Sequence, residues 1–359
     1  VWTGVAPCVL LSRQGLCRAR SRRQVAFVCL CLPVACVLSS CREQSPRSFS
    51  SLNVAAQTRC GAGAAMDAEA AGGHDGLRVG EDVRLGPLSV GASHVFFASP
   101  SGLSVALSRI QAITPGHTVV LPRRVVARLA DLDDAELQDL WDTTRTAQSL
   151  LERLHQATAC NIAVFDGPAA GQPVAHVHVH VVPRRAGDAL GDDKVHHALE
   201  QWTPQGIPSL CLTFGGVLEE ARQPRTQEVM AAEALRYRAR CLALGGAELP
   251  SSAVKFAQFD IAAASVFFSS PTGLTVAFVN LKPLLPGHVL VTTRRVVPRW
   301  GQLSDDELFD LFWSVKVVQA AVTAELGLNS ANLGIQDGGD SGQSVPHVHV
   351  HVLPRTAPR

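Results

Sequence analysis

The sequence predicts an α+β fold built from two tandem copies of one domain. Three observations support this prediction: a repeat at constant spacing, a series of short apolar strands leading into one long helix, and alternating histidines near the end of each copy. The chain has 359 residues, enough for roughly two domains. Its 47% hydrophobic and 18% charged residues argue against a disordered or multi-span membrane protein. A formal net charge of +1 gives no indication of a nucleic-acid partner.

The repeat has an offset of 171 residues, the spacing from His117 to His288, and it runs without a gap from residue 95 to residue 184. A repeat of this length indicates two copies of a domain rather than a short solenoid unit. The matching segments are 95–97 and 266–268, 115–117 and 286–288, 176–180 and 347–351, and 183–184 and 354–355.

Each copy is expected to form an antiparallel meander sheet with a long helix on one face. Asp133 with Glu136 forms a capping-box pattern, and Ser304 with Glu307 repeats it, so a helix should begin at each site. Apolar residues then recur at helical spacing. In the first copy the Val- and Leu-rich strand segments, separated by Pro/Gly turns, are 95–97, 103–107, 118–121 and 162–165, followed by the histidine strand.

We expect three segments along the chain: a leader and linker at 1–80, a first domain at 81–250 with a helical extension near 226–242, and a second domain at 251–359. Residues 1–65 hold eight Arg, no Lys and one acid, together with seven of the ten cysteines. Three interpretations stay open for them. In the first, the mature protein is cytoplasmic, starts near Met66 and does not contain these residues. In the others, they form a mitochondrial or plastid transit peptide, or a lipoprotein signal. With so few cysteines after Met66, we expect reduced thiols and an intracellular protein.

Histidines are the candidate functional residues. In a strand, alternate side chains share a face, so His176, His178 and His180, and likewise His347, His349 and His351, should each form a row with the valines facing the core. Pro-Gly-His sequences place His117 and His288 each 59 residues before a row. A solvated face, a zinc site and a nucleophilic histidine are the competing interpretations. No Cys or acid recurs nearby as a further zinc ligand, which leaves the nucleophile favoured.

A glycine-rich loop before each row points to phosphate chemistry. Gly342-Gln343-Ser344-Val345 leads into the second row, and Gly171-Gln172-Pro173-Val174 leads into the first. Glycine lets a backbone approach a phosphate closely, and backbone N–H groups act as anion donors. Proline removes one such donor from the first copy.

These residues resemble the histidine triad superfamily, and most of all its fragile histidine triad branch, the dinucleoside polyphosphate hydrolases. The resemblance covers roughly residues 83–359 and includes Ala277–Asn280, Pro286–His288, Gln336–Gly338 and His347–Val352. It implies a five-stranded antiparallel sheet with helices, and pairing into a ten-stranded pseudo-dimer within one chain or a homodimer between chains.

The resemblance also implies roles for the second copy. His349 would attack a nucleotide α-phosphate to form a nucleotidyl-histidine, and His351 would hydrogen-bond the phosphoryl or leaving-group oxygen. His347 and His288 would orient the nucleophile. Asn280 and Gln336 would contact the nucleotide, while Gln343 and the backbone from Gly342 to Val345 would hold the phosphates. No cofactor bound by the protein is expected, although Mg²⁺ or Mn²⁺ can accompany the substrate.

The two copies depart from the family pattern in different ways. The first keeps its four histidines but has Arg109 in place of Asn280 and Phe165 in place of Gln336, which puts its turnover in doubt. The second lacks a C-terminal portion, and we expect the segment 185–250 to cover its site. The leading function is hydrolysis of dinucleoside polyphosphates or related nucleotidyl conjugates. The alternative is a nucleotide-binding signalling module with little turnover. We expect no nucleic-acid partner and no membrane association of the mature protein.

Overall fold

The computed structural model describes residues 81–108, 112–188, 190, 198–199 and 223–356. The expected leader and linker at 1–80 and the first-copy residue Arg109 lie outside the described residues. In the part that the structure describes, no helix is both long and apolar enough to cross a bilayer. The described cysteines, Cys160 and Cys241, are buried free thiols.

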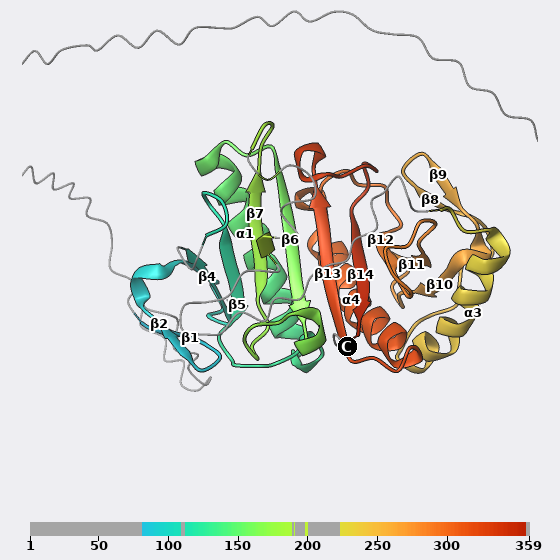
Figure 1. Cartoon of the computed structure of the whole chain (residues 1–359), viewed down its shortest axis with the longest axis horizontal. Helices are drawn as coiled ribbons and strands as arrows, with labels where there is room; N and C mark the ends of the chain where they lie inside the picture. Colours follow the sequence, from blue (N-terminus) through green and yellow to red (C-terminus); the bar gives the residue numbers. More distant parts are fainter. Residues whose placement is uncertain (1–80, 109–111, 189, 191–197, 200–222, 357–359) are drawn as a thin grey trace, which may run out of the picture. The chain divides into compact units, whose positions relative to one another are not determined.

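Ten strands form one antiparallel sheet, five from each copy (Figure 1). The order along the sheet is β10-β11-β12-β14-β13-β6-β7-β5-β4-β3, so the two copies join edge to edge within one chain. This confirms the predicted ten-stranded pseudo-dimer. The strands are β3 (Val95–Ala98), β4 (Ser104–Ser108), β5 (Thr118–Pro122), β6 (Ala159–Asp166) and β7 (Val179–Arg184) in the first copy, and β10 (Val266–Ser269), β11 (Thr275–Val279), β12 (Val289–Thr293), β13 (Ser330–Asp337) and β14 (His349–Arg355) in the second.

The junction between the copies is the antiparallel pair β6–β13. Its register runs from Ala331 opposite Asp166 to Asp337 opposite Cys160. Ala163 and Gly334 are opposite each other, and they occupy the same place in the repeat. A pseudo-two-fold axis therefore passes between these two residues.

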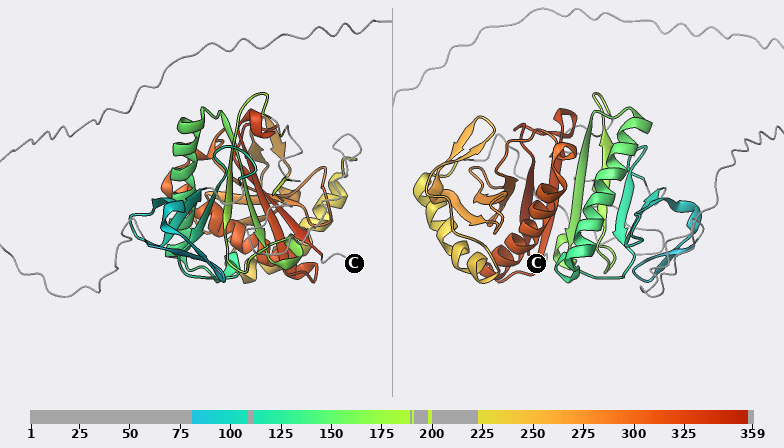
Figure 2. Two further views of the ribbon diagram at one scale, coloured as in Figure 1. Left: turned by 60° about the vertical axis from the view of Figure 1, so that its left-hand side comes forward. Right: turned by 180° about the vertical axis from the view of Figure 1, so that it is seen from behind.

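The long helices α1 (Asp134–His155) and α4 (Asp305–Glu325) lie side by side on one face of the sheet (Figure 2). Each begins with the predicted capping box, in which the cap side chain accepts from the backbone of the N3 glutamate and that glutamate accepts from the cap backbone. The valines that alternate with the histidines, and the one that follows each row, pack beneath these helices in the main core, as predicted: Val177, Val179, Val181, Val348, Val350 and Val352.

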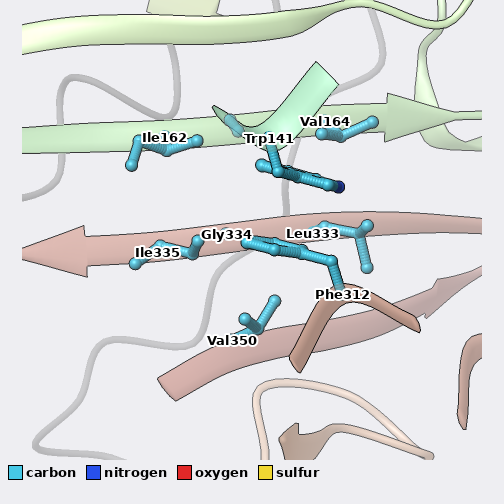
Figure 3. Close-up of a pocket in the computed structure, with 9 residues that line it drawn as sticks. Trp141, Ile162, Val164, Phe312, Leu333, Gly334, Ile335 and Val350 are labelled. Carbon is cyan, nitrogen blue, oxygen red and sulfur yellow. The ribbon is translucent and has the colours of Figure 1, made fainter. Parts of the chain in front are cut away.

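Trp141 of α1 and Phe312 of α4 meet between the copies. Their rings stack with centroids 3.4 Å apart and planes 6° apart, and they lie against β6 and β13 (Figure 3). Both side chains are buried. The apolar core is therefore continuous across the junction, in addition to the backbone ladder.

Buried polar bridges also join the copies. Gln319 of α4 donates to the carboxylate of Asp166 on β6. In the equivalent contact, Gln148 of α1 donates to Asp337 on β13 across 2.7 Å. Each carboxylate also accepts from the backbone N–H that begins a short 3-10 helix. These bonds satisfy carboxylates that the fold has removed from water.

Smaller elements complete each copy. Each copy has one hairpin that forms a separate two-stranded sheet. The first pairs β1 (Val83–Leu85) with β2 (Leu88–Val90), and the second pairs β8 (Val254–Phe256) with β9 (Phe259–Ile261). The helix expected near 226–242 is present as α3 (Gln227–Ala243). It packs against β10, the 3-10 helix Ala263–Ser265 and α4, all from the second copy (Figure 1).

Candidate active site

The structure brings together the four histidines predicted for each site. In the second copy, β14 pairs with β12 and β13 so that His351 lies opposite both Leu290 and Gly334. The turn before β12 brings His288 against His351, with Nε2 and Nδ1 2.9 Å apart. Regular strand structure begins only at His349, but His347 keeps the alternation. All three triad histidines lie on the face opposite α1 and α4.

The hydrogen bonds of His349 assign its proton. Nδ1 lies 2.7 Å from the carbonyl oxygen of His347. A carbonyl only accepts, so Nδ1 carries the hydrogen, and the neutral ring then has its lone pair on Nε2. The side chain is 4% exposed, and burial lowers its pKa below the ordinary value of 6.5. His349 is thereby held in the tautomer of a nitrogen nucleophile.

A second chain of bonds assigns the proton on His351. The backbone N–H of Leu284 donates to His288 Nδ1 across 3.0 Å, so the hydrogen of the neutral His288 ring is on Nε2. That Nε2–H donates to His351 Nδ1. In the neutral ring of His351 the remaining hydrogen is therefore on Nε2. One site thus contains a lone pair on His349 and an N–H on His351.

His347 is a structural support for this arrangement. Ala257, at the turn between β8 and β9, donates its N–H to His347 Nδ1 across 3.3 Å. The ring then donates from Nε2 to the carbonyl of Arg295, 3.1 Å away. Burial lowers the pKa of His347 to about 4, so the ring stays neutral around pH 7. Its carbonyl is consequently held where it accepts from His349.

The loop before the triad is pinned by its glutamine. Gln343 accepts from the N–H of Gly338 across 2.8 Å and donates to the carbonyl of Pro298 across 3.0 Å. Gln172 makes the equivalent bonds in the first copy. The glutamine expected to hold phosphate therefore shapes the loop through its side chain. Gly342, at φ +88°, adopts a backbone conformation that favours glycine.

The two predicted nucleotide-contacting residues flank the triad. Asn280 Oδ1 accepts from the N–H of Lys282, which turns Nδ2 towards His288, 3.2 Å from Nε2. Because that Nε2 carries the hydrogen donated to His351, the approach of Nδ2 is a close contact and not a hydrogen bond. Gln336 is half-buried on β13, two residues beyond Gly334 and on the same face. Ser344 is exposed in the loop, and Val345 packs against the apolar cluster around Phe256.

The first site has the same proton arrangement but different surroundings. His178 Nδ1 lies 2.7 Å from the carbonyl of His176, and His117 Nε2 lies 3.1 Å from His180 Nδ1. Burial lowers the pKa of His117 to about 3 and that of His178 to about 4. His178 is 1% exposed and His180 0%, so both are fully enclosed.

Apolar side chains fill the region beside His180. The ring of Phe165, at the position of Gln336, meets the imidazole edge-on with centroids 5.6 Å apart. Phe165 clusters with Ala163, Val182 and Leu199. The second copy has Gly334 and Gln336 at the positions of Ala163 and Phe165, so at these two described positions it has a smaller residue and a polar side chain.

Three residues near the second site were missed from sequence. Phe256 packs against both His347 and His349, with centroids 5.3 and 5.2 Å away. Ala257 donates to His347, and Arg225 donates from Nε to the carbonyl of Asn280 across 3.1 Å. The repeat offset could have indicated two of these residues, because it also aligns Leu85-Gly86 with Phe256-Ala257.

Two Arg-Arg pairs, at 123–124 and 294–295, are related by the repeat offset, and one arginine of each pair has a glutamate partner. Arg124 donates to Glu136 from Nε across 2.6 Å, and Arg295 does the same to Glu307 across 2.7 Å. Each glutamate is the N3 residue of a capping box. One arginine of each pair thus ties the strand end to the helix start. Among the described residues, no cluster of His, Cys, Asp and Glu could hold a metal ion.

The sequence model of the HIT domain family matches residues 92–187 and 263–357, which together are more than half of the chain. A "Bifunctional bis(5'-adenosyl)-triphosphatase/adenylylsulfatase FHIT" from Arabidopsis thaliana is 38% identical over 154 residues, which are 43% of this chain and 81% of the relative. A "Bis(5'-nucleosyl)-tetraphosphatase [asymmetrical]" from Schizosaccharomyces pombe is 52% identical over 100 residues, 28% of this chain and 53% of the relative.

The nitrilase and fragile histidine triad fusion protein NitFhit of Caenorhabditis elegans is 38% identical over 156 residues, 44% of this chain, and the match spans about a third of that longer protein (32%). The matched segments contain both sets of four histidines and both glycine-rich loops. The chain therefore belongs to the HIT domain family, and it carries two copies of that domain in tandem.

Proposed function

We propose that this protein hydrolyses dinucleoside polyphosphates, or related nucleotidyl conjugates, at the second histidine site. The observation that carries the proposal is the proton arrangement: His349 holds a lone pair on Nε2 while His351 holds a hydrogen on Nε2 in the same site. A nucleophile beside a donor is what displacement at an anhydride phosphorus needs. The named activities of the relatives support the same chemistry.

The first half-reaction forms a nucleotidyl-histidine. His349 Nε2 attacks the α-phosphorus, a P–N bond forms, and the P–O bond to the leaving phosphate breaks. The N–H of His351 donates a hydrogen bond to the phosphoryl or leaving oxygen as charge builds there. In the loop Gly342–Val345, the N–H groups of Gly342 and Gln343 donate to the carbonyls of Gly339 and Gly338. The backbone N–H groups of Ser344 and Val345 are therefore the loop donors that stabilise the equatorial oxygens. The Nδ1–H bond to the His347 carbonyl stabilises the positive ring that results.

The second half-reaction returns the site to its starting state. Water attacks the same phosphorus and loses a proton to solvent, the P–N bond breaks, and a nucleoside monophosphate leaves. The lone pair returns to Nε2 of His349. We expect Mg²⁺ or Mn²⁺ to arrive with the substrate's phosphates, and the protein to hold no cofactor of its own. We expect Asn280 and Gln336 to contact the nucleotide.

The experiment uses the full chain with diadenosine triphosphate and diadenosine tetraphosphate. AMP release is measured for the unmodified protein, for His349→Asn and for the matched His178→Asn. We expect His349→Asn to lose at least about a thousandfold in kcat, since the nucleophile is removed, and His178→Asn to keep nearly full turnover.

Two results would redirect the assignment. Equal losses in the two variants would make the first copy a second catalytic centre. Nucleotide binding without any AMP release would support the alternative, a binding module with little turnover. The apolar packing of Phe165 and Leu199 beside His180 is the reason we assign turnover to the second copy.

A further inference from the structure

Each copy holds the loop of the other copy across the pseudo-two-fold axis. Asn161 of β6 donates from Nδ2 to the carbonyl of Ser341, 3.0 Å away. Asn332 of β13 makes the equivalent bond to the carbonyl of Ala170 across 2.9 Å. The two asparagines occupy the same place in the repeat and are 2% and 5% exposed. Ser341 directly precedes Gly342, the first residue of the second loop.

The orientation of the Asn161 amide is fixed from behind. Arg184 donates from Nη1 to Asn161 Oδ1 across 2.6 Å, so the oxygen faces the arginine and the amino group must face Ser341. Asp188 holds the same guanidinium through two bonds of 2.7 and 3.0 Å. Arg184 is 1% exposed, which makes this a buried and ordered network.

Asn161 also lies beside a predicted nucleotide contact. It is the cross-strand partner of Gln336 in the β6–β13 register, and both side chains lie on the histidine face. One first-copy residue thus adjoins the second site at two points: the turn that begins the phosphate loop and the strand position of Gln336.

We propose that Asn161, held by Arg184 and Asp188, is a positioning residue for the reaction of the second site. This inference rests on the proposed function, since it assigns turnover to that site. Asn161 acts through the Ser341 carbonyl, which fixes a turn closed by the N–H groups of Gly342 and Gln343 on the carbonyls of Gly339 and Gly338. The backbone N–H groups of Ser344 and Val345 follow this turn and approach the phosphate. Donors aimed in advance at developing charge contribute mainly to the transition state, so their loss lowers kcat.

The pseudo-symmetry supplies a matched control. Asn161→Asp keeps the shape and the contact with Arg184 but replaces the donor to Ser341 with an oxygen. Asn332→Asp makes the same change towards the first site. With diadenosine triphosphate in the full chain, we expect Asn161→Asp to lower kcat about tenfold or more while KM changes less than about threefold. Asn332→Asp should keep kcat within about twofold, whatever either change does to the melting temperature.

Equal losses of kcat in the two variants, or no loss in either, would overturn the proposal. Arg184→Lys and Arg184→Met give an independent arm: Lys retains a donor to Asn161 and should keep more turnover than Met, and equal rates would count against the network. His349→Asn is run in the same assay. If the His349→Asn variant retains turnover, the proposed function is wrong, and this inference is wrong as well. If that variant loses turnover, the results for Asn161→Asp and Asn332→Asp test the inference separately from the proposed function.

Discussion

Trp141 and Phe312 occupy the same place in the two copies and stack face to face where the copies join. Each ring also meets Trp300 edge-on, with centroids 6.2 and 6.0 Å away. The junction is consequently the centre of one core that both halves share.

Removing the stacked ring should destabilise the whole molecule. We expect Phe312→Ala to lower the free energy of unfolding by about 3–5 kcal/mol, because it opens a void in a close-packed core. Phe309→Ala, one turn earlier on α4 and only half-buried, is the control and should cost less than about half as much. Urea unfolding followed by circular dichroism measures both. Equal losses of unfolding free energy in the two variants would show that the ring of Phe312 at the junction stabilises the fold no more than the half-buried ring of Phe309.

The hairpin turns that donate to His176 and His347 contain Gly86 and Ala257. We expect exchanges between glycine and alanine at these two positions to change stability in opposite directions. Gly86 has φ +57°, and an added Cβ would lie 2.3 Å from Val174 Cγ1. Gly86→Ala should therefore cost about 1–3 kcal/mol through strain and overlap. Ala257 occupies the matching turn at φ +49°, so Ala257→Gly relieves strain and should be neutral or stabilise by up to about 1 kcal/mol. Thermal unfolding of both variants checks the sign; a stabilised Gly86→Ala would contradict it.

Arg225 should influence nucleotide affinity through Asn280. Its guanidinium donates to the Asn280 carbonyl and pairs with Glu233, which also accepts from Tyr237 across 2.9 Å. Arg225→Met should raise KM several-fold with a smaller change in kcat, since the Asn280 amide loses its fixed position. Arg238→Met is the control, because Arg238 also holds backbone carbonyls near α3 but lies outside this contact. A similar KM in both variants would assign Arg225 a purely structural role.

Stability should fall as the pH drops below 6.5. Burial lowers the pKa of His117 to about 3 and of His178 and His347 to about 4, whereas unfolded histidines titrate near 6.5. Between those values the unfolded chain binds more protons than the folded one, so the free energy of unfolding falls as the pH is lowered through this window, and these histidines contribute no pH dependence above it.

Urea titrations at pH 7, 6 and 5 test this linkage. His178→Asn removes one such group and should show a shallower decline than the unmodified protein between pH 6.5 and about 4. A decline that begins only below pH 4.5 would instead point to carboxylates such as Glu136 and Glu307, whose pKa values are lowered by their arginine partners.

The secondary structure and the site histidines were predictable because both follow local periodicity. Helical spacing after a capping box placed α1 and α4, and alternation placed three imidazoles on one face and the valines beneath the helices. The constant repeat offset predicted two equivalent domains. The capping boxes and the two periodicities depend only on residues near one another in the chain, and the repeat needs only a comparison of the chain with itself.

What could not be predicted depends on partners distant in sequence. We expected the segment 185–250 to lie over the second copy, but the periodicity of α3 does not identify the elements that it packs against, β10 and α4. We expected the glutamine of the glycine-rich loop, Gln343, to bind phosphate. Its side-chain amide instead accepts from the N–H of Gly338 and donates to the carbonyl of Pro298. Asn161 carried no signal of its own, since its role arises only where β6 meets β13.

The β6–β13 junction has a consequence for how this protein responds to dilution and to mutation over time. In a dimer of separate chains, such a junction dissociates at low concentration, and every substitution appears in both halves. Here one chain supplies both strands, so the junction persists at any concentration and each half accumulates changes independently. Divergence at Phe165 and Gln336 is then tolerable, because one half can lose a binding surface while still serving as the other half's scaffold.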